Sequence, residues 1–384
     1  MTDYIVVGAG LCGSVLSRHL AEQGKTVEIW ERRDHIGGNM FDYRDNNGIL
    51  IQKYGPHILH TRQKYLFDYM SRFEEWNEFC LKCGAEIDGK YTPTPFNFKT
   101  IDDFYPPNEA EELKRRLLDA FQGRETATVI EVLEHVDPLI RGYAQFLFEK
   151  DYSLYTAKQW GVPPSEIDVS VLKRVPLRFS YQEGYFDDDY QALPVHSYTK
   201  FFENLLNHPK IHLKLGVNAM ERLQVHSAGN TIFLDGQPAE CGVIYTGALD
   251  ELFNCCYGPL PYRSLRFELQ TLQMDSYQDA PVVAYPEAEG YTRITEYKKL
   301  PVQDIPGKTT IAIEYPLPYR GDNTAEPYYP ILTKESKEAY QKYLKLAKQI
   351  PNLTICGRLA DFQYYNMDQA LARALKVCQD IIPS

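Results

Sequence analysis

The stretch YIVVGAGLCG, residues 4–13, decides the fold of this chain because it places a G-x-G-x-x-G motif directly after an apolar run. Gly8 allows a tight turn, Gly10 lets the backbone approach a pyrophosphate, and Gly13 lets the following helix pack closely on the strand. The N-terminus of that helix offers unpaired N–H groups and the positive end of a dipole to phosphate. The stretch therefore predicts a strand–turn–helix unit that binds a dinucleotide.

Two features further along indicate which dinucleotide is bound. A second predicted strand, residues 27–30, ends at Glu31, whose carboxylate suits the hydroxyls of a ribose. The segment HIGGN, residues 35–39, then adds a second glycine pair, which is typical of flavin enzymes rather than of NAD dehydrogenases. Glycines let the backbone run close beside a second part of a long cofactor. The pattern therefore favours FAD.

The far end of the chain is consistent with a flavin site. Residues 353–356 are predicted to form a strand, followed by Gly357-Arg358 and by a helix that starts near Met367-Asp368. The N-terminus of this helix can donate N–H groups to the flavin end of FAD. The alternative is a simple C-terminal helix that packs on the sheet. Residues 212–217 and 242–247 are predicted to be further strands of the same sheet.

The predicted fold class is α/β: a discontinuous FAD-binding, Rossmann-like domain with an inserted helical domain and an antiparallel β-sheet domain. Apolar residues recur at helical spacing between residues 65 and 160, and Asp137-Pro138 suits the start of a helix. Alternating or apolar runs after residue 170 indicate an antiparallel sheet. The predicted boundaries are 1–64, 195–255 and 350–384 for the FAD-binding domain, 65–165 for the helical domain, and 166–194 with 256–349 for the sheet domain.

Composition limits the partners and the compartment. A net charge of −11 over 384 residues argues against a general nucleic-acid-binding surface. No stretch is apolar for long enough to span a bilayer, and the start lacks the basic leader of a signal peptide, so we expect a cytoplasmic protein with reduced cysteines. Cys80-x-x-Cys83 has no second pair at matching spacing, so we expect ordinary thiols and no metal site.

With these segments in view, the chain resembles the UDP-galactopyranose mutase family over essentially its full length. Besides GAG (8–10) and HIGGN (35–39), the segments that carry the resemblance follow one another in the order of the family. They are YGPHILHT (54–61), KQWG (158–161), KRVPLRF (173–179), GYF (184–186), YTK (198–200), YRSL (262–265), YTRITE (291–296), PYYP (327–330) and GRL (357–359). So many ordered matches make the resemblance very specific.

The resemblance implies a redox-neutral ring contraction that interconverts a nucleotide-activated hexopyranose and hexofuranose, of the UDP-galactopyranose to UDP-galactofuranose type. In this family reduced FAD is the nucleophile: its N5 forms a covalent adduct with C1 of the sugar while the diphosphate leaves, and the ring opens and recloses before the diphosphate returns. The resemblance also implies a nucleotide-sugar substrate, an external reductant such as NAD(P)H, a homodimer and a role in surface polysaccharide biosynthesis.

The resemblance assigns roles to individual residues. Arg174 and Arg293 are expected to hold the diphosphate, because a guanidinium binds phosphate oxygens bidentately and stays charged. Arg174 stands where the family has a mobile lid, and His60 is expected as a catalytic residue beside the flavin. The other predicted substrate-binding residues are Tyr155, Trp160, Tyr185, Tyr315, Tyr328, Tyr364, Asp151 and Leu81. The predicted cofactor-binding residues are Gly8, Gly10, Gly13, Glu31, Arg32, Gly38, Asn39, His57, Ile58, Val217, Arg263, Arg358, Met367 and Asp368.

The residues expected to face the base and the sugar depart from the family pattern. Asp151 stands where an aromatic residue commonly stacks on uracil. Leu81 and Val283 stand in place of asparagines, and Leu59 in place of a phenylalanine. Each such swap removes a contact worth about 1–3 kcal/mol. Either neighbouring residues replace these contacts and UDP-galactose remains the substrate, or the substrate is dTDP-fucopyranose, UDP-N-acetylgalactosamine or a GDP-sugar.

Two other function classes share the predicted cofactor fold. A flavin amine oxidase-like oxidoreductase has no use for two phosphate-binding arginines. A non-catalytic binding protein would be marked by the loss of Arg174 or Arg293, and both are present. The arginines therefore favour the mutase over both alternatives.

Overall fold

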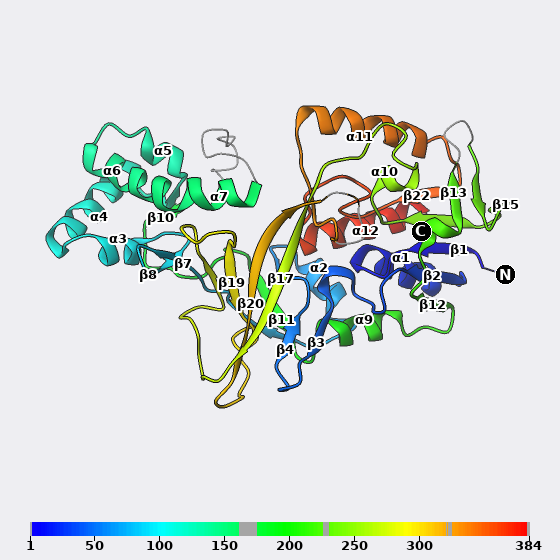
Figure 1. Ribbon diagram of the computed structural model, residues 1–384, viewed down its shortest axis with the longest axis horizontal. Helices are drawn as coiled ribbons and strands as arrows, with labels where there is room; N and C mark the ends of the chain where they lie inside the picture. Colours follow the sequence, from blue (N-terminus) through cyan, green and yellow to red (C-terminus); the bar gives the residue numbers. More distant parts are fainter. Residues whose placement is uncertain (1, 161–174, 226–229, 320, 322–324, 382–384) are drawn as a thin grey trace.

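A five-stranded parallel sheet forms the base of the nucleotide-binding part (Figure 1). The computed structural model describes residues 2–160, 175–225, 230–319, 321 and 325–381. The strand order is β12-β2-β1-β16-β22, and every neighbouring pair is parallel. The strands are β1 (Tyr4–Val7), β2 (Val27–Glu31), β12 (Ile211–Leu215), β16 (Gly242–Tyr245) and β22 (Leu353–Ile355). The predicted Rossmann-like fold is confirmed, including the two late strands that return to this sheet.

Helices cover this sheet because each has an apolar stripe at helical spacing. In α1 (Leu11–Glu22) the side chains of Val15, Leu16 and Leu20 are fully buried, and α1 packs against both α12 (Met367–Ile381) and α9 (Tyr198–Leu206). The remaining helices here are α2 (Lys64–Met70), α10 (Leu249–Leu252) and α11 (Lys334–Ala347). The packing of α1 on α12 brings the N-terminal and C-terminal ends of the chain into one core.

A second, seven-stranded sheet extends from the nucleotide-binding part toward the helical part (Figure 1). Its order is β21-β17-β20-β19-β18-β7-β8. The strands are β7 (Cys83–Ile87), β8 (Lys90–Thr94), β17 (Tyr262–Leu272), β18 (Val282–Ala284), β19 (Arg293–Glu296), β20 (Thr309–Pro318) and β21 (Tyr329–Pro330). All pairs are antiparallel except β18 with β7. The long β17–β20 pair spans the middle of the molecule, so a side chain on it can reach a site between the two parts.

The helical part has its own hydrophobic core, centred on residues such as Leu113, Tyr143 and Leu147. Asp137 caps α6 as expected, because its carboxylate accepts a hydrogen bond of 2.8 Å from the backbone N–H of Leu139. The helices are α3 (Phe98–Phe104), α4 (Pro107–Phe121), α5 (Val129–Leu133), α6 (Pro138–Leu147), a π-helix (Phe148–Tyr152) and α7 (Ser153–Trp160).

The segment 65–165, expected to be a mainly helical domain, also contains strands. Residues 76–94 form β6 (Trp76–Glu78), β7 and β8, and β7 pairs with β18 of the seven-stranded sheet. Cys83, Ala85 and Ile87 are buried at every second position, which is the period of a strand. The pairing partner lies about two hundred residues away, so the local pattern alone was ambiguous.

The expected sheet domain also differs in its membership. β11 (Tyr190–Pro194) pairs with β5 (Leu59–Thr61) and β6 in a separate three-stranded sheet, and β10 (Leu177–Arg178) pairs with β9 (Thr126–Ala127). Small elements complete the fold: β3 (Asp42–Arg44), β4 (Leu50–Gln52), β13 (Leu223–Val225), β14 (Ile232–Leu234), β15 (Gln237–Pro238) and the 3-10 turns Gly38–Met40 and Ala219–Glu221. Among the described residues, no helix is both long and apolar enough to cross a bilayer.

Candidate active site

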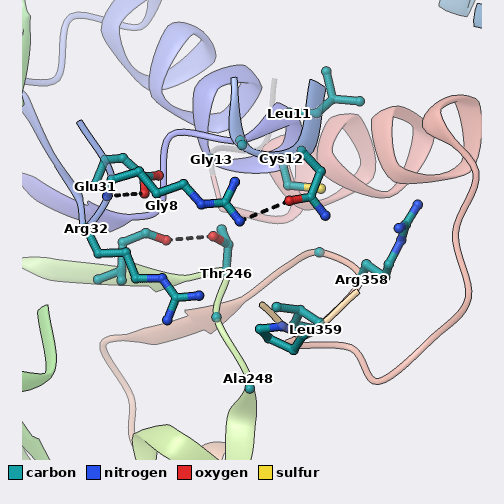
Figure 2. Close-up of a pocket in the computed structure, with 18 of the residues that line it drawn as sticks. Gly8, Leu11, Cys12, Gly13, Glu31, Arg32, Thr246, Ala248, Arg358 and Leu359 are labelled. Carbon is teal, nitrogen blue, oxygen red and sulfur yellow. Dashed lines mark hydrogen bonds between the residues drawn. The ribbon is translucent and has the colours of Figure 1, made fainter. Parts of the chain in front are cut away.

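The glycine motif lies at the carboxyl end of β1, where it lines a long pocket (Figure 2). Gly8 has a φ of +101°, and a Cβ on it would lie 2.2 Å from Oγ1 of Thr246. A Cβ on Gly13 would lie 2.0 Å from the carbonyl oxygen of Gly8. A Cβ on Gly38 would lie 2.9 Å from Cα of Gly10, so the second glycine pair packs backbone to backbone on the first motif. These approaches require glycine and leave the loop open toward the pocket.

Acidic and basic side chains meet at the nucleotide end of the pocket. Glu31 accepts a hydrogen bond of 2.8 Å from the backbone N–H of Ala9, which fixes its carboxylate against the glycine loop. Arg32 and Arg33 both pair with Glu326, and the Arg33 contact is 3.1 Å. Although burial favours the neutral form of Glu326, the two arginines hold the pKa of its carboxyl below the usual value. Sequence patterns missed Glu326 because it lies almost three hundred residues from its partners.

The C-terminal segment forms the opposite wall of the pocket. Asn366 and Met367, at the start of α12, line it. Arg358 lies on the same wall (Figure 2). The guanidinium of Arg358 donates a hydrogen bond of 2.6 Å to the carbonyl of Tyr365 and lies 5.0 Å from the ring centre of Tyr329. The N-termini of α1 and α12 therefore both face this pocket, as the sequence predicted for a flavin dinucleotide.

His57 has a fixed tautomer in the same pocket. Its Nδ1 lies 2.8 Å from the carbonyl oxygen of Gly55, and because a carbonyl only accepts, Nδ1 carries the proton and Nε2 is the acceptor. Burial lowers the pKa of His57 to about 4, and the charges of Arg358 and Arg293 act in the same direction. His57 is therefore a neutral imidazole at neutral pH.

Arg293 lies on β19 directly opposite Glu314 on β20. Its Nε donates a hydrogen bond of 2.7 Å to the Glu314 carboxylate, which is 3% exposed, while the Arg293 side chain is 24% exposed. Because Nε holds Glu314, the two terminal nitrogens of the guanidinium remain oriented for a further anion. Besides burial, the charge of Arg293 lowers the pKa of His57, so this held guanidinium lies near His57, and its expected contact with the diphosphate stays a prediction.

Lys158 fastens α7 to the loop between β18 and β19. Its ammonium donates hydrogen bonds of 2.6, 2.8 and 2.8 Å to the carbonyls of Tyr285, Ala288 and Tyr291. These three bonds use all three N–H donors of the ammonium. Since Arg293 follows this loop on β19, Lys158 positions the helix that carries Tyr155 relative to Arg293.

We expect the substitution Lys158→Met to loosen this loop, because Met fills the space but leaves three carbonyls without a charged donor. Burial lowers the pKa of Lys158 to about 8, which shows that desolvation of the ammonium offsets part of the gain from its hydrogen bonds. We therefore expect the Met variant to lose about 2 kcal/mol of local stability in this loop. Hydrogen exchange of amides 285–291 should accelerate at least tenfold, because local opening of the loop becomes easier by about this free energy. Lys82→Met, at an exposed pair with Glu183, is the control that should change neither exchange nor melting temperature.

His60 has a different neighbourhood from His57. Its Nδ1 lies 2.7 Å from the Asp188 carboxylate, and its ring stacks on Phe186 with centroids 3.7 Å apart. Arg62 approaches the second oxygen of Asp188 at 3.4 Å. His60 is not among the described residues that line the flavin pocket, so its place beside the flavin stays a prediction.

Most predicted cofactor residues come together in the pocket, and three do not. The ones that line it are Gly8, Gly10, Gly13, Glu31, Arg32, Gly38, Asn39, His57, Val217, Arg358 and Met367. Ile58 is instead 7% exposed and packs in the main core, as is usual for an aliphatic side chain. Arg263 donates to the carbonyl of Lys158, and Asp368 accepts from the backbone N–H of Gln369.

The predicted substrate-binding residues do not all lie in one place, and their neighbours differ. Tyr328 lines the pocket, and Tyr364 stacks on Tyr329 with centroids 5.0 Å apart. Tyr315 carries the guanidinium of Arg266 over its ring at 3.9 Å. The Tyr185 N–H donates to the carbonyl of Leu81, whose side chain is 4% exposed in the main core. Arg174 and the side chain of Trp160 lie outside the described part of the chain.

Comparison with known proteins decides the family. The family model for UDP-galactopyranose mutase matches residues 150–364, and a model for an NAD(P)-binding Rossmann-like domain matches residues 6–73. A UDP-galactopyranose mutase of Mycoplasma pneumoniae is 36% identical over 99% of this chain and 96% of its own length. The chain belongs to the UDP-galactopyranose mutase family. Within this family, a dTDP-fucopyranose mutase of Escherichia coli is 32% identical over 99% of the chain and 98% of its own length.

The same fold occurs in a solved member of the family. A crystal structure of reduced UDP-galactopyranose mutase matches with a TM-score of 0.73 at 16% identity, and covers 99% of this chain and 94% of that one. As a member of the UDP-galactopyranose mutase family, this chain is an isomerase with a flavin cofactor. The residues fit such a group, because Gly8, Gly10 and Gly13 line the pocket together with the start of α12, where backbone N–H groups can meet phosphate and ring oxygens. Sequence patterns missed Thr246, whose hydroxyl is what excludes a side chain at Gly8.

Proposed function

We propose that this family member interconverts the pyranose and furanose forms of UDP-galactose with bound FAD in its reduced state. The observation that carries the proposal is the position of Arg293, which is held by Glu314 and whose charge acts on His57 at the flavin pocket. A cation fixed beside the cofactor suits a diphosphate leaving group that must depart and return without diffusing away. When bound, reduced flavin would supply the nucleophilic nitrogen that displaces this diphosphate from the sugar.

The protein's own residues would hold the two partners of this reaction. The glycine cradle, Glu31 and the α12 N-terminus would bind the dinucleotide, with Arg358 beside it. The terminal nitrogens of Arg293 would donate to the diphosphate oxygens, and Arg174 would provide a second guanidinium. Neutral His57 would present a hydrogen-bond acceptor at Nε2 toward the pocket. Tyr328 lines the pocket, and its hydroxyl would contact the bound substrate.

The proposal includes the wider setting that the resemblance implies. We propose NAD(P)H as an external reductant, a homodimer, a cytoplasmic location and a role in surface polysaccharide biosynthesis. Mass measurement in solution tests the dimer, and anaerobic titration with NADPH while flavin absorbance is followed tests the reductant.

A turnover assay tests the function. Protein loaded with FAD and reduced by dithionite should convert UDP-galactofuranose to UDP-galactopyranose for many cycles per reduction, as followed by chromatography. A flavin amine oxidase-like oxidoreductase would instead consume oxidant in proportion to product. Protein that takes up no flavin, or that yields no ring isomer from any sugar nucleotide, would refute the proposal.

A second substrate is favoured by one observation. The dTDP-fucopyranose mutase of Escherichia coli is nearly as similar to this chain as the UDP-galactopyranose mutases are. With Asp151, Leu81 and Val283 in place of the family's usual residues, dTDP-fucopyranose, UDP-N-acetylgalactosamine and a GDP-sugar belong in the same assay. A higher kcat/KM for one of them would reassign the substrate and leave the chemistry in place.

A further inference from the structure

Three charged side chains from distant parts of the chain meet at the flavin pocket. Arg32 and Arg33 follow β2 of the nucleotide-binding part, whereas Glu326 precedes β21 of the seven-stranded sheet. Both arginines pair with the Glu326 carboxylate, Arg33 at 3.1 Å, and all three residues line the pocket. These ion pairs, which we call the latch, therefore connect two walls of the pocket that belong to different parts of the molecule.

The arginine side of the latch is held in place by the nucleotide-binding part. The backbone N–H of Arg33 donates a hydrogen bond of 2.9 Å to the Glu31 carboxylate. The guanidinium of Arg33 donates a hydrogen bond of 3.0 Å to Asn39 and lies 4.3 Å from the ring centre of Tyr54. A guanidinium held by these neighbours has little freedom to follow a carboxylate that moves away.

The glutamate side of the latch is held by the seven-stranded sheet. The hydroxyl of Ser264 donates a hydrogen bond of 2.6 Å to the carbonyl of Glu326. Two residues further on, the backbone N–H of Tyr328 donates a hydrogen bond of 2.8 Å to the carbonyl of Arg263. Ser264 and Arg263 both lie on β17, so the carboxylate reaches the arginines from a fixed backbone. The latch opens when this side chain turns away or when the two walls separate.

Solvent reaches the latch, which makes it easy to open. The side chains of Arg32 and Glu326 are 45% and 30% exposed, whereas the Glu314 carboxylate that holds Arg293 is 3% exposed. Ion pairs that water reaches are weak and are screened by salt, because water and ions compete for both partners. The latch is therefore suited to repeated opening, unlike the buried pair of Arg293 with Glu314.

A cofactor that enters this pocket has to pass between the walls that the latch joins. Resting on the proposed FAD cofactor, we propose that the latch gates cofactor exchange: FAD enters or leaves only while Glu326 is released from Arg32 and Arg33. Opening costs the same free energy in both directions, so the latch slows entry and release equally and leaves the affinity unchanged. A redox-neutral mutase benefits from slow release, because one reduction serves many turnovers only while the reduced flavin stays bound.

The test measures the exchange rates of Glu326→Gln, which removes the charge and keeps the shape of the side chain. Release is followed by mixing the FAD-loaded protein with excess 5-deaza-FAD and identifying the bound flavin by chromatography after desalting. Entry is followed by the flavin fluorescence when FAD is added to protein stripped of flavin. Both rates should rise about tenfold, an effect of the size that two partly exposed ion pairs give, while the Kd for FAD changes less than twofold.

Glu22→Gln is the matched control. Glu22 also pairs with two arginines, Arg18 at 2.8 Å and Arg72 at 2.6 Å, and its side chain is likewise 30% exposed, but it is not among the described residues that line the pocket. Its exchange rates should equal those of the wild type. Raising NaCl from 0.1 to 1 M shortens the screening length from about 10 to about 3 Å, so the tenfold ratio between Glu326→Gln and wild type should fall to about twofold. Melting temperatures show that each variant is folded.

The outcomes separate this inference from the proposed function. Faster release without faster entry would overturn the gate, because it would mean that Glu326 stabilises bound FAD directly. Equal rates in Glu326→Gln and Glu22→Gln, or a rate ratio that salt does not reduce, would overturn it too. In each of these cases the wild type still binds FAD and the proposed function stands, whereas a wild type that takes up no flavin would refute the proposed function itself.

Discussion

The substitution Arg293→Lys is expected to lower kcat/KM for the sugar nucleotide by a factor of about 10² to 10³. A lysine in this position keeps one positive charge, but its single ammonium has to pair with the buried Glu314 carboxylate, as Nε of Arg293 does now at 2.7 Å. The two terminal nitrogens that we propose contact the diphosphate are then lost. A hydrogen bond to a charged group contributes about 1.5–3 kcal/mol, and losing one or two of them gives this range.

The stability of Arg293→Lys should change little, because the Glu314 carboxylate keeps a cationic partner. Steady-state kinetics with reduced enzyme measures the effect, and thermal unfolding shows that the fold is kept. Arg115→Lys makes the same exchange at an exposed ion pair on α4 and serves as the control with unchanged kinetics. Wild-type kcat/KM in Arg293→Lys would show that the guanidinium does not contact the diphosphate.

The second large effect is expected from Gly13→Ala, which should abolish flavin binding and destabilise the fold by about 3 kcal/mol. Helix propensity alone predicts the opposite, because alanine in a helix is about 1 kcal/mol better than glycine. The added Cβ, however, would lie 2.0 Å from the carbonyl oxygen of Gly8 and 3.2 Å from a methyl of Val6. The helix must therefore move away from β1, and the cradle for the pyrophosphate opens with it.

Gly142→Ala is the matched control for that prediction. Gly142 lies inside α6 and a Cβ on it would meet nothing within 4 Å, so alanine should stabilise the protein by about 0.5–1 kcal/mol. Flavin absorbance after reconstitution and desalting, together with chemical denaturation, measures both variants. A Gly13→Ala protein that retains stoichiometric flavin would show that the close contact between helix and loop is dispensable.

Local sequence was sufficient for the elements that local chemistry fixes. The strand before Gly8, the capping of α6 by Asp137 and the late strand β22 followed by α12 all appear where the pattern predicted them. Each depends on residues within a few positions of one another, through side-chain period, proline and glycine geometry or a cap. The resemblance added Arg293, which no local pattern distinguishes from a surface charge.

The tertiary structure decided what depends on distant partners. Residues 83–94 become strands because β18 offers an edge for them. Glu326 joins the nucleotide end only because folding brings it to Arg33, almost three hundred residues away in the chain. Likewise, the sequence alone does not distinguish Lys158 and Asp151 from charged residues on the surface.

The sequence by itself therefore determined the dinucleotide fold and the positions of its glycines, since the G-x-G-x-x-G spacing and the side-chain periods of the flanking strand and helix act over neighbouring residues. Only the tertiary structure decided that the donors of Lys158 are fully used, because hydrogen-bond saturation depends on the groups that folding brings within about 3 Å of a donor.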